Sequence, residues 1–488
     1  MKNLKNLLYI IPLGLAVSCA PEFEDEITFT NGQADFTTYV AVGNSLTAGF
    51  QSGALRKVRQ ENSFPAILAA QFAEVGGGAF KQPLLADGAG VGSPKPNVFP
   101  PSAPAERELG YTTDCDGKIS IGLKPEVEGQ KDQLFDPTTY VGGNGTNPSK
   151  GPFNNLGIPG AKTFHLVSGG YGNPANLLTN PPTANPFYVR FAANNNESVA
   201  AAAAKMKPTF FTMWIGANDV LGYGLQGGEE GPDVITATAM FSATYNMTLD
   251  SLLKSGAKGV LANIPNITSL PYFNKINRNG LELTAEKAAQ LNAAYAPYNE
   301  GVDNAIAGSV ITAEQGRQRK ISFVAGANRW VITDDKLNSI PGLPKSRQMR
   351  HNEHLIMVTP QDSLECAGWG SSKGIPSNYV LTSDEVTKIN TATNEFNNVI
   401  KTAASKHNLG FLDANKLMAE MESGLTYNGV TYSADFVTGG AFSLDGFHPS
   451  TRGYAIIANE FIDVINDKYG AKVRKIDPNS YEGILFPN

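Results

Sequence analysis

Residues 39–50 read Tyr-Val-Ala-Val-Gly-Asn-Ser-Leu-Thr-Ala-Gly-Phe. The apolar run at 39–42 has the length and composition of a buried parallel strand, and Gly43 begins a tight turn into a helix. Such a turn exposes Ser45 at the carboxyl end of a strand, where open α/β sheets keep their functional sites. Ser45 is therefore a candidate nucleophile, provided that a base and an oxyanion hole lie elsewhere in the chain.

Helical and strand patterns alternate along much of the chain after this first strand. A short strand is expected near 154–158, and a last helix follows Pro449 with one apolar face. The other expected elements are a helix at 63–75 and three helix-then-strand pairs, at 197–206 with 209–215, at 239–254 with 259–264 and at 383–407 with 409–412. This alternation predicts a three-layer α/β/α fold of flavodoxin-like type around a central parallel sheet.

Two irregular regions, at about 76–152 and 311–382, interrupt the pattern. The first is rich in Gly, Pro, Asn and Asp and is too long for an ordinary connection in a compact domain. We interpret both regions as loop insertions that line the substrate pocket. A hairpin is expected at 321–332, and the long helix predicted at 284–306 is expected to break near Pro297.

The N-terminus has the features of a secretory signal, because two lysines precede an apolar stretch too short to span a membrane. Ala16-Val17-Ser18-Cys19 resembles a bacterial lipobox, in which the cysteine becomes the lipidated first residue. The acidic run at 22–26 resembles the surface-export signal of Bacteroidetes lipoproteins. An ordinary signal peptide that happens to contain Cys19 is the alternative. We therefore expect a signal at 1–18, an acidic tether at 19–35 and lipid anchoring to the outer membrane, periplasmic or surface-exposed.

Charge and cysteine content exclude some classes of partner. The formal charge of −6 over 488 residues gives no basic face for nucleic acid, so we expect none, and contact with a membrane only through the anchor. Apart from Cys19, only Cys115 and Cys366 occur. In an oxidising compartment they either pair or remain free thiols. Three cysteines without a Cys-x-x-Cys motif do not build a metal site, so none is expected.

Acyl transfer by a serine needs a base, a group that orients the base, and donors for the oxyanion. His448 is the candidate base, and Asp445, three residues earlier, can reach its ring from the same loop. Pro449 is expected to begin the following helix. The candidate oxyanion donors are the N–H groups of Ser45 and Gly160 and the side-chain amide of Asn218. Each follows an expected strand, so all can meet at one edge of the sheet.

Four blocks of sequence carry a resemblance to the SGNH or GDSL hydrolases, in the family's order. They are Gly43-Asn44-Ser45-Leu46, Asn155-Leu-Gly-Ile-Pro-Gly160, Gly216-Ala217-Asn218-Asp219 and Asp445-Gly446-Phe447-His448-Pro449. The resemblance implies that Ser45 is the nucleophile, that His448 is the base oriented by Asp445, and that Gly160 and Asn218 complete the oxyanion hole. It covers about 36–469 but not the insertions. Asn44 stands where the family's motif has Asp.

The resemblance implies a serine esterase or lipase without a cofactor. Its substrate would be a small-molecule, lipid or polysaccharide ester, such as a lipid acyl ester or an acetylated carbohydrate, since fold alone does not choose among them. The hydrolase domain is expected at 36–470, followed by a C-terminal tail at 471–488. The alternative is a surface lipoprotein on a catalytically retired hydrolase fold that binds glycan or lipid.

Overall fold

The computed structural model describes residues 28–94, 102–135 and 151–487. The expected signal at 1–18 and Cys19 lie outside these residues. At the centre is a five-stranded parallel sheet in the order β15 (Gly410–Leu412), β8 (Lys258–Ala262), β7 (Phe210–Trp214), β1 (Tyr39–Gly43) and β6 (Asn155–Gly157). Numbered along the chain and read from the β6 edge, this is the 2-1-3-4-5 order of flavodoxin-like sheets. The predicted α/β fold around a central parallel sheet is confirmed.

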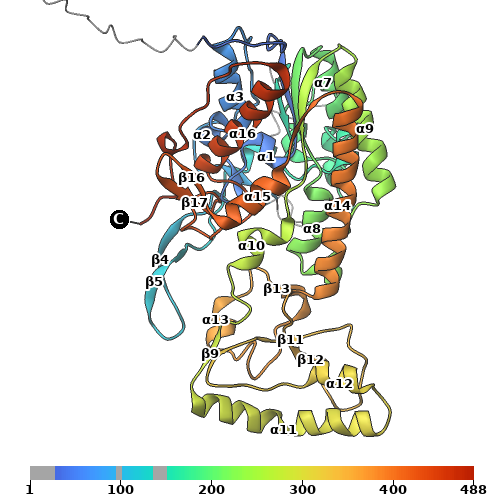
Figure 1. The fold of residues 1–488 in the computed structure, drawn as a ribbon, viewed down its shortest axis with the longest axis vertical. Helices are drawn as coiled ribbons and strands as arrows, with labels where there is room; N and C mark the ends of the chain where they lie inside the picture. The colour runs from blue at the N-terminus through green and yellow to red at the C-terminus, as the bar shows by residue number, and fades with distance from the viewer. Residues whose placement is uncertain (1–27, 95–101, 136–150, 488) are drawn as a thin grey trace, which may run out of the picture.

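Helices cover both faces of this sheet (Figure 1). On one side lie α3 (Phe64–Ala73) and α16 (Thr451–Tyr469), joined by the stacked rings of Phe64 and Phe461. On the other side lie α7 (Val199–Lys205), α9 (Thr238–Leu253) and α14 (Ser383–Lys406). Because β1 is covered on both faces, its side chains are all buried, and this explains its unbroken apolar run.

The register of the central strands brings their carboxyl ends level. Gly43, the last residue of β1, pairs with Gly157 at the end of β6 and with Trp214 at the end of β7. The loops that follow these three strands carry the candidate nucleophile and the two other candidate oxyanion residues. The register therefore starts all three loops at one edge of the sheet.

A second lobe hangs below the sheet in Figure 1 and has its own hydrophobic cluster, which extends from Leu281 to Val380. It contains α11 (Ala285–Ala307), α12 (Ala313–Arg319), α13 (Gln361–Glu365), β11 (Val331–Thr333), β12 (Ser346–Gln348), β13 (His354–Leu355) and β14 (Val380–Leu381). The lobe thus begins before residue 311, the expected start of the insertion. The helix predicted at 284–306 belongs to the lobe and does not cover the sheet.

Two local predictions for this lobe are wrong. The helix α11 continues through Pro297 without a break, because Tyr298 and Val302 on its next turn are held in the lobe's cluster. The expected hairpin at 321–332 does not form. Instead β10 (Gly326–Asn328) pairs with β9 (Leu281–Leu283), and β11 pairs with β12. The backbone N–H and C=O groups that the hairpin would have paired with each other bond instead to β9 and β12, which are distant in sequence.

The first insertion contains a hairpin, made of β4 (Leu109–Thr113) and β5 (Ile119–Leu123), that projects from the body toward the lobe (Figure 1). A disulfide joins Cys115, in the turn of this hairpin, to Cys366, directly after α13, with the two Cα atoms 6.5 Å apart. Of the two states left open from the sequence, the structure has the paired one. The bridge connects the two insertions across 251 residues of chain.

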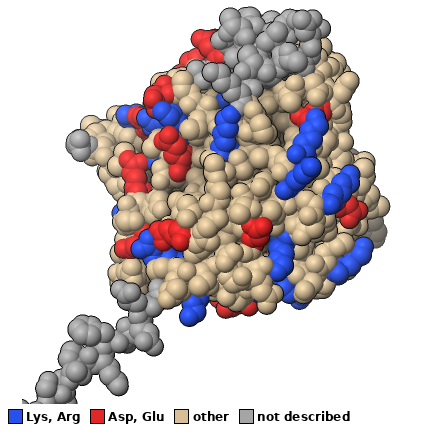
Figure 2. Space-filling view, turned by 90° about the horizontal axis from the view of Figure 1, so that it is seen from above, with Lys and Arg blue, Asp and Glu red and all other residues tan. Residues whose placement is uncertain are grey.

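Charged side chains of both signs are interspersed on the face of the molecule shown in Figure 2, with no single-sign patch. Among the described helices, none combines the length and the apolar composition that crossing a bilayer requires.

Candidate active site

A tight turn after β1 positions Ser45. Gly43 ends the strand, and the short helix α1 (Ser45–Ala48) folds back at once over the strand's end. A Cβ atom on Gly43 would lie 2.2 Å from Thr47 Oγ1 and 2.4 Å from the carbonyl oxygen of Trp214. Only glycine fits such an approach. Ser45 is 7% exposed and lies at the start of α1, beyond the edge of the sheet.

Asn44 caps this helix. Its side-chain Oδ1 accepts a hydrogen bond from the backbone N–H of Leu46 at 3.0 Å. An aspartate could accept the same bond, but it would bring a charge into a position that is only 1% exposed. With Asn at this position, in place of the Asp of the family's motif, the helix keeps its cap and no charge is buried.

Asp445 and His448 form a hydrogen-bonded pair on one loop. His448 Nδ1 lies 2.8 Å from Asp445 Oδ2, which also accepts the backbone N–H of Gly53 at 2.7 Å. The other carboxylate oxygen, Oδ1, accepts the backbone N–H groups of His448 at 2.9 Å and Phe447 at 3.1 Å. The hydroxyl of Ser443 donates to it at 3.2 Å. Both oxygens are thus held by donors, and the carboxylate has one orientation.

The ionisation of Asp445 follows from these contacts. Burial by itself would raise the pKa of the Asp445 carboxyl, but the facing His448 ring and the backbone N–H groups outweigh burial and lower that pKa to about 2. An ionised carboxylate accepts the Nδ1 proton of His448. This leaves Nε2, the other ring nitrogen, to accept a proton in the pocket.

The sequence did not indicate the loop that supports this pair. Ser52, which has φ +51°, donates its backbone N–H to the Ser443 hydroxyl at 2.8 Å. The Ser52 hydroxyl in turn accepts the backbone N–H of Leu444 at 3.3 Å. Together with Gly53, this turn anchors the loop of Asp445 from nearly four hundred residues away. Closeness to Ser45 in the sequence is the only signal that could have indicated it.

The structure also brings the loops of Gly160 and Asn218 together. Asn218, the first residue of α8 (Asn218–Leu225), donates its side-chain amide to the carbonyl oxygen of Ala161 at 3.0 Å. Gly160 has φ +79°, and the preceding Pro159 carbonyl accepts the side-chain amide of Asn185 at 2.8 Å. Ser45, Asn218 and His448 line one cavity. Gly160 is exposed and is not among the lining residues, but it lies on the loop to which Asn218 is hydrogen-bonded.

Buried Asp219 fixes the start of α8. Its carboxylate accepts the backbone N–H of Thr163 at 3.0 Å and the Thr163 hydroxyl at 2.8 Å, and it is 0% exposed. Burial raises the pKa of this carboxyl, and the bonds from Thr163 oppose that shift. The contact ties α8 to α5 (Thr163–Val167), which follows the loop of Gly160. These two hydrogen bonds therefore connect the loop of Gly160 to the loop of Asn218.

The cavity beside Ser45 and His448 has a volume of about 80 Å³ and is mostly apolar. Its walls come from the sheet edge, from α8, and from one face each of α15 (Ala414–Ser423) and α16. The apolar lining includes Leu221, Ile267, Leu270, Leu417, Met418, Met421, Phe442, Ile456 and Ile457. The expectation that the insertions line the pocket is wrong for their described residues, because none of these belongs to 76–152 or 311–382. Helices α8, α15 and α16 and the sheet edge enclose the cavity without them.

Within the described part of the chain, one cluster of side chains is close enough to share a metal ion: Cys115, Asp116 and Cys366. Its two sulfurs are joined to each other. This cluster lies at the turn of the β4–β5 hairpin and includes none of the residues that line the cavity beside Ser45.

Comparison with known proteins bears on the second half of this site. Residues 334–461 match the family described as GDSL-like Lipase/Acylhydrolase. The matched range includes Asp445 and His448. Ser45, Gly160 and Asn218 come earlier in the chain and lie outside the match. A search of curated proteins finds no match. Over this range, about a quarter of the chain, the sequence is similar to the GDSL hydrolases, a similarity that suggests ester hydrolysis in general, and the flavodoxin-like sheet is consistent with it.

Proposed function

We propose that the protein hydrolyses carboxylic esters by a Ser-His-Asp acyl-enzyme mechanism, with Ser45 as nucleophile, His448 as base and Asp445 as the orienting group. One observation carries the proposal: His448, which is hydrogen-bonded to buried Asp445, lines the same apolar cavity as Ser45. A binding protein needs a cavity, but it does not need a buried carboxylate of lowered pKa behind a histidine in its wall.

The proposed reaction has two halves. In the first, Ser45 Oγ bonds to the ester carbonyl carbon while its proton passes to His448 Nε2. The bond to the alcohol oxygen then breaks, and His448 gives the proton to the leaving alcohol, so that the acyl group remains on Ser45. In the second half a water gives its proton to His448 and bonds to the acyl carbon, and the acid leaves as Ser45 recovers its proton.

Negative charge develops on the carbonyl oxygen in each half. The backbone N–H groups of Ser45 and Gly160 and the amide of Asn218 are the proposed donors to that oxygen. In support, one hydrogen of the Asn218 amide is used on Ala161, which orients the amide and leaves its second hydrogen for the oxyanion.

The cavity favours an acyl chain of several carbons over an acetyl group. Its walls are aliphatic and thioether side chains from α15 and α16, which offer an acetylated sugar few polar partners. Burial of one methylene contributes about 0.8 kcal/mol, or roughly fourfold in binding. We therefore propose that kcat/KM rises with chain length until the cavity is full, and that the substrate is a lipid or other acyl ester.

We also propose that the enzyme acts at the cell envelope, tethered through a lipid on Cys19. The lipobox-like residues that precede this cysteine and the acidic run that follows it support this location.

Hydrolysis of p-nitrophenyl acetate, butyrate, octanoate and palmitate by the wild type and Ser45→Ala tests the mechanism. Ser423→Ala is a matched control, because Ser423 is exposed at the end of α15. We expect activity in the wild type and the control, an optimum beyond acetate, and loss in Ser45→Ala. A fluorophosphonate probe should label Ser45. A folded wild type that neither hydrolyses any ester nor takes up the probe would instead support the glycan- or lipid-binding alternative.

A further inference from the structure

A second cavity, which we call the lobe pocket, lies in the second lobe and shares no lining residue with the cavity beside Ser45 and His448. It has a volume of about 190 Å³. Its charged lining consists of the cationic residues Arg319, Lys336, Arg347 and Arg350 and the anionic residues Asp334 and Asp384. Cations therefore outnumber anions in its wall, and each cation has to be examined for a partner.

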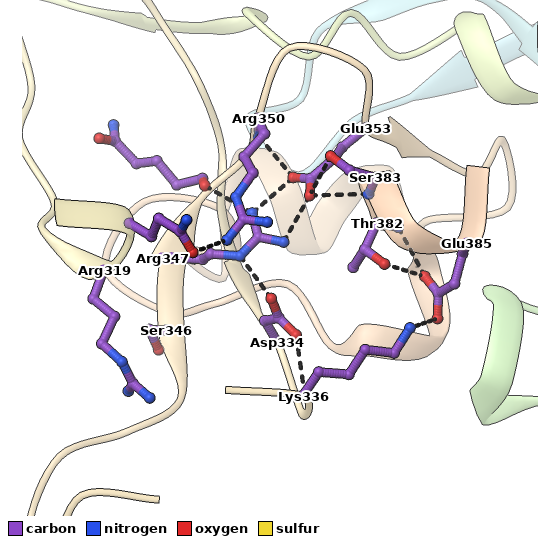
Figure 3. Close-up of polar contacts among 12 residues, drawn as sticks. Arg319, Asp334, Lys336, Ser346, Arg347, Arg350, Glu353, Thr382, Ser383 and Glu385 are labelled. Carbon is purple, nitrogen blue, oxygen red and sulfur yellow. Dashed lines mark hydrogen bonds and ion pairs between the residues drawn. The ribbon is translucent and has the colours of Figure 1, made fainter. Parts of the chain in front are cut away.

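Two of the cations are paired. Arg347 is 0% exposed and makes two hydrogen bonds of 2.7 Å to Glu353 and one of 2.7 Å to Asp334 (Figure 3). Lys336 lies 3.1 Å from a carboxylate oxygen of Glu385. The charges of Arg347 and Lys336 are thus balanced by carboxylates of the lobe and of α14.

Arg319 has no carboxylate partner among the described residues. Its side chain is buried, with the residue 1% exposed, and its Nη2 donates to the carbonyl oxygen of Asn338. Within the described residues, its Nε and Nη1 are buried and have no hydrogen-bond partner. Figure 3 draws no contact between the guanidinium of Arg319 and the carboxylates of Asp334, Glu353 or Glu385. Burial raises the pKa of Tyr298, and the charge of Arg319 together with a side-chain hydrogen bond from it opposes that rise, but the neutral phenol supplies Arg319 with no counter-charge.

Arg350 is the fourth cation. Its Nη2 donates to Gln318 Oε1 at 2.8 Å, and the described residues supply it with no ion pair. Glu314 is close enough for the charge of Arg350 to lower its pKa, but that carboxylate bonds to Arg317 and Gln318. The pocket is therefore bordered by two guanidinium groups to which the described part of the chain supplies no carboxylate partner.

We propose that the lobe pocket binds a small anion, a carboxylate or a phosphate group, through Arg319 and Arg350. A guanidinium buried without a counter-ion is costly, and a bound oxyanion supplies the charge and acceptors that Arg319 lacks. Planar guanidinium groups match carboxylate and phosphate oxygens in geometry. A cavity of roughly 150 Å³ holds a benzene-sized molecule, so this one has room for such a group with several attached atoms. Of the two acidic residues in the wall, Asp334 is paired with Arg347 and Asp384 is exposed.

Isothermal titration calorimetry on the full-length protein tests the proposal, with sodium phosphate and sodium galacturonate in separate titrations at constant ionic strength. Glucose is the neutral control. We expect saturable binding of at least one anion and none of glucose. Binding of phosphate alone assigns a phosphoryl ligand, binding of galacturonate alone assigns a carboxylate ligand, and binding of neither overturns the proposal.

Three variants locate the binding. Arg319→Met and Arg350→Gln should each weaken it roughly tenfold or more, since each removes a charged donor. Arg317→Gln is the matched control, because Arg317 lies on the same helix but outside the pocket, and it should bind like the wild type. Unaltered binding by Arg350→Gln would overturn the proposal even if Arg319→Met does not fold. Circular dichroism on each variant checks its folding.

Discussion

Asp445→Asn is the substitution that most directly tests the proposed mechanism. The amide is nearly the same size as the carboxylate, so the loop should keep its shape. Oδ1 of the carboxylate accepts two backbone N–H groups, from Phe447 and His448, so the amide oxygen should take that position. The amide nitrogen then faces His448 Nδ1 and the backbone N–H of Gly53. It would donate to Nδ1 and move the ring proton to Nε2, the nitrogen that must accept the proton of Ser45.

The effect on rate and on stability can be estimated separately. Loss of the correct tautomer lowers kcat by roughly 10⁴-fold in a serine protease triad, and we expect a loss on the order of 10³- to 10⁴-fold here. The pKa of Asp445 falls from 3.8 to about 2 on folding, which corresponds to about 2 kcal/mol. Because the folded pKa is the lower one, this contribution is present above about pH 4 and disappears as the pH falls through about 2. Asp445→Asn should lose it at neutral pH.

The assay is steady-state hydrolysis of p-nitrophenyl butyrate, with urea unfolding measured on the same samples. Asp435→Asn is the matched control, since Asp435 is exposed and bonds to Ser433. The control should keep wild-type kcat and stability. A folded Asp445→Asn protein with kcat within tenfold of the wild type would refute the role that we assign to the carboxylate.

The remaining predictions concern the pocket and the anchor. Met418→Phe, on the wall of the cavity, should shift the optimal acyl chain by about two carbons toward shorter esters, with roughly fourfold lost per excluded methylene. Met240→Phe, half exposed on α9, should leave the chain-length profile unchanged, and an unchanged profile in Met418→Phe would contradict the pocket assignment. Cells fed an alkyne-tagged fatty acid should label the wild type but not Cys19→Ala, and equal labelling of the two would exclude lipidation at this cysteine.

Much of the core could be predicted because its signals are local. The strand expected at 209–215 is β7 (Phe210–Trp214), and the helix expected at 383–407 is α14 (Ser383–Lys406). In both, burial and periodicity agree over one continuous segment. The start of the last helix was predicted less well: it begins at Thr451, with Ser450 as its cap, because Pro449 belongs to the loop of His448.

The lobe was predicted poorly because its contacts are not local. β9 and β10 pair across more than forty residues, and a short strand of this kind has no pattern that identifies its partner. The helix α11 has a helical pattern, but periodicity does not say whether a helix covers the sheet or packs in a separate cluster. Only the contacts of Tyr298 and Val302 decide that question.

The sequence by itself determined the α/β class, the turn at Gly43 and the candidate residues Ser45, Asp445 and His448, because apolar periodicity, a glycine turn and a three-residue spacing are all visible in one short stretch each. The tertiary structure alone decided three further matters. Ser52 and Gly53 support the loop of Asp445, α15 and α16 form walls of the cavity beside Ser45, and two arginines without a carboxylate partner among the described residues border the lobe pocket. These depend on which distant segments meet, and packing rather than local pattern determines those meetings.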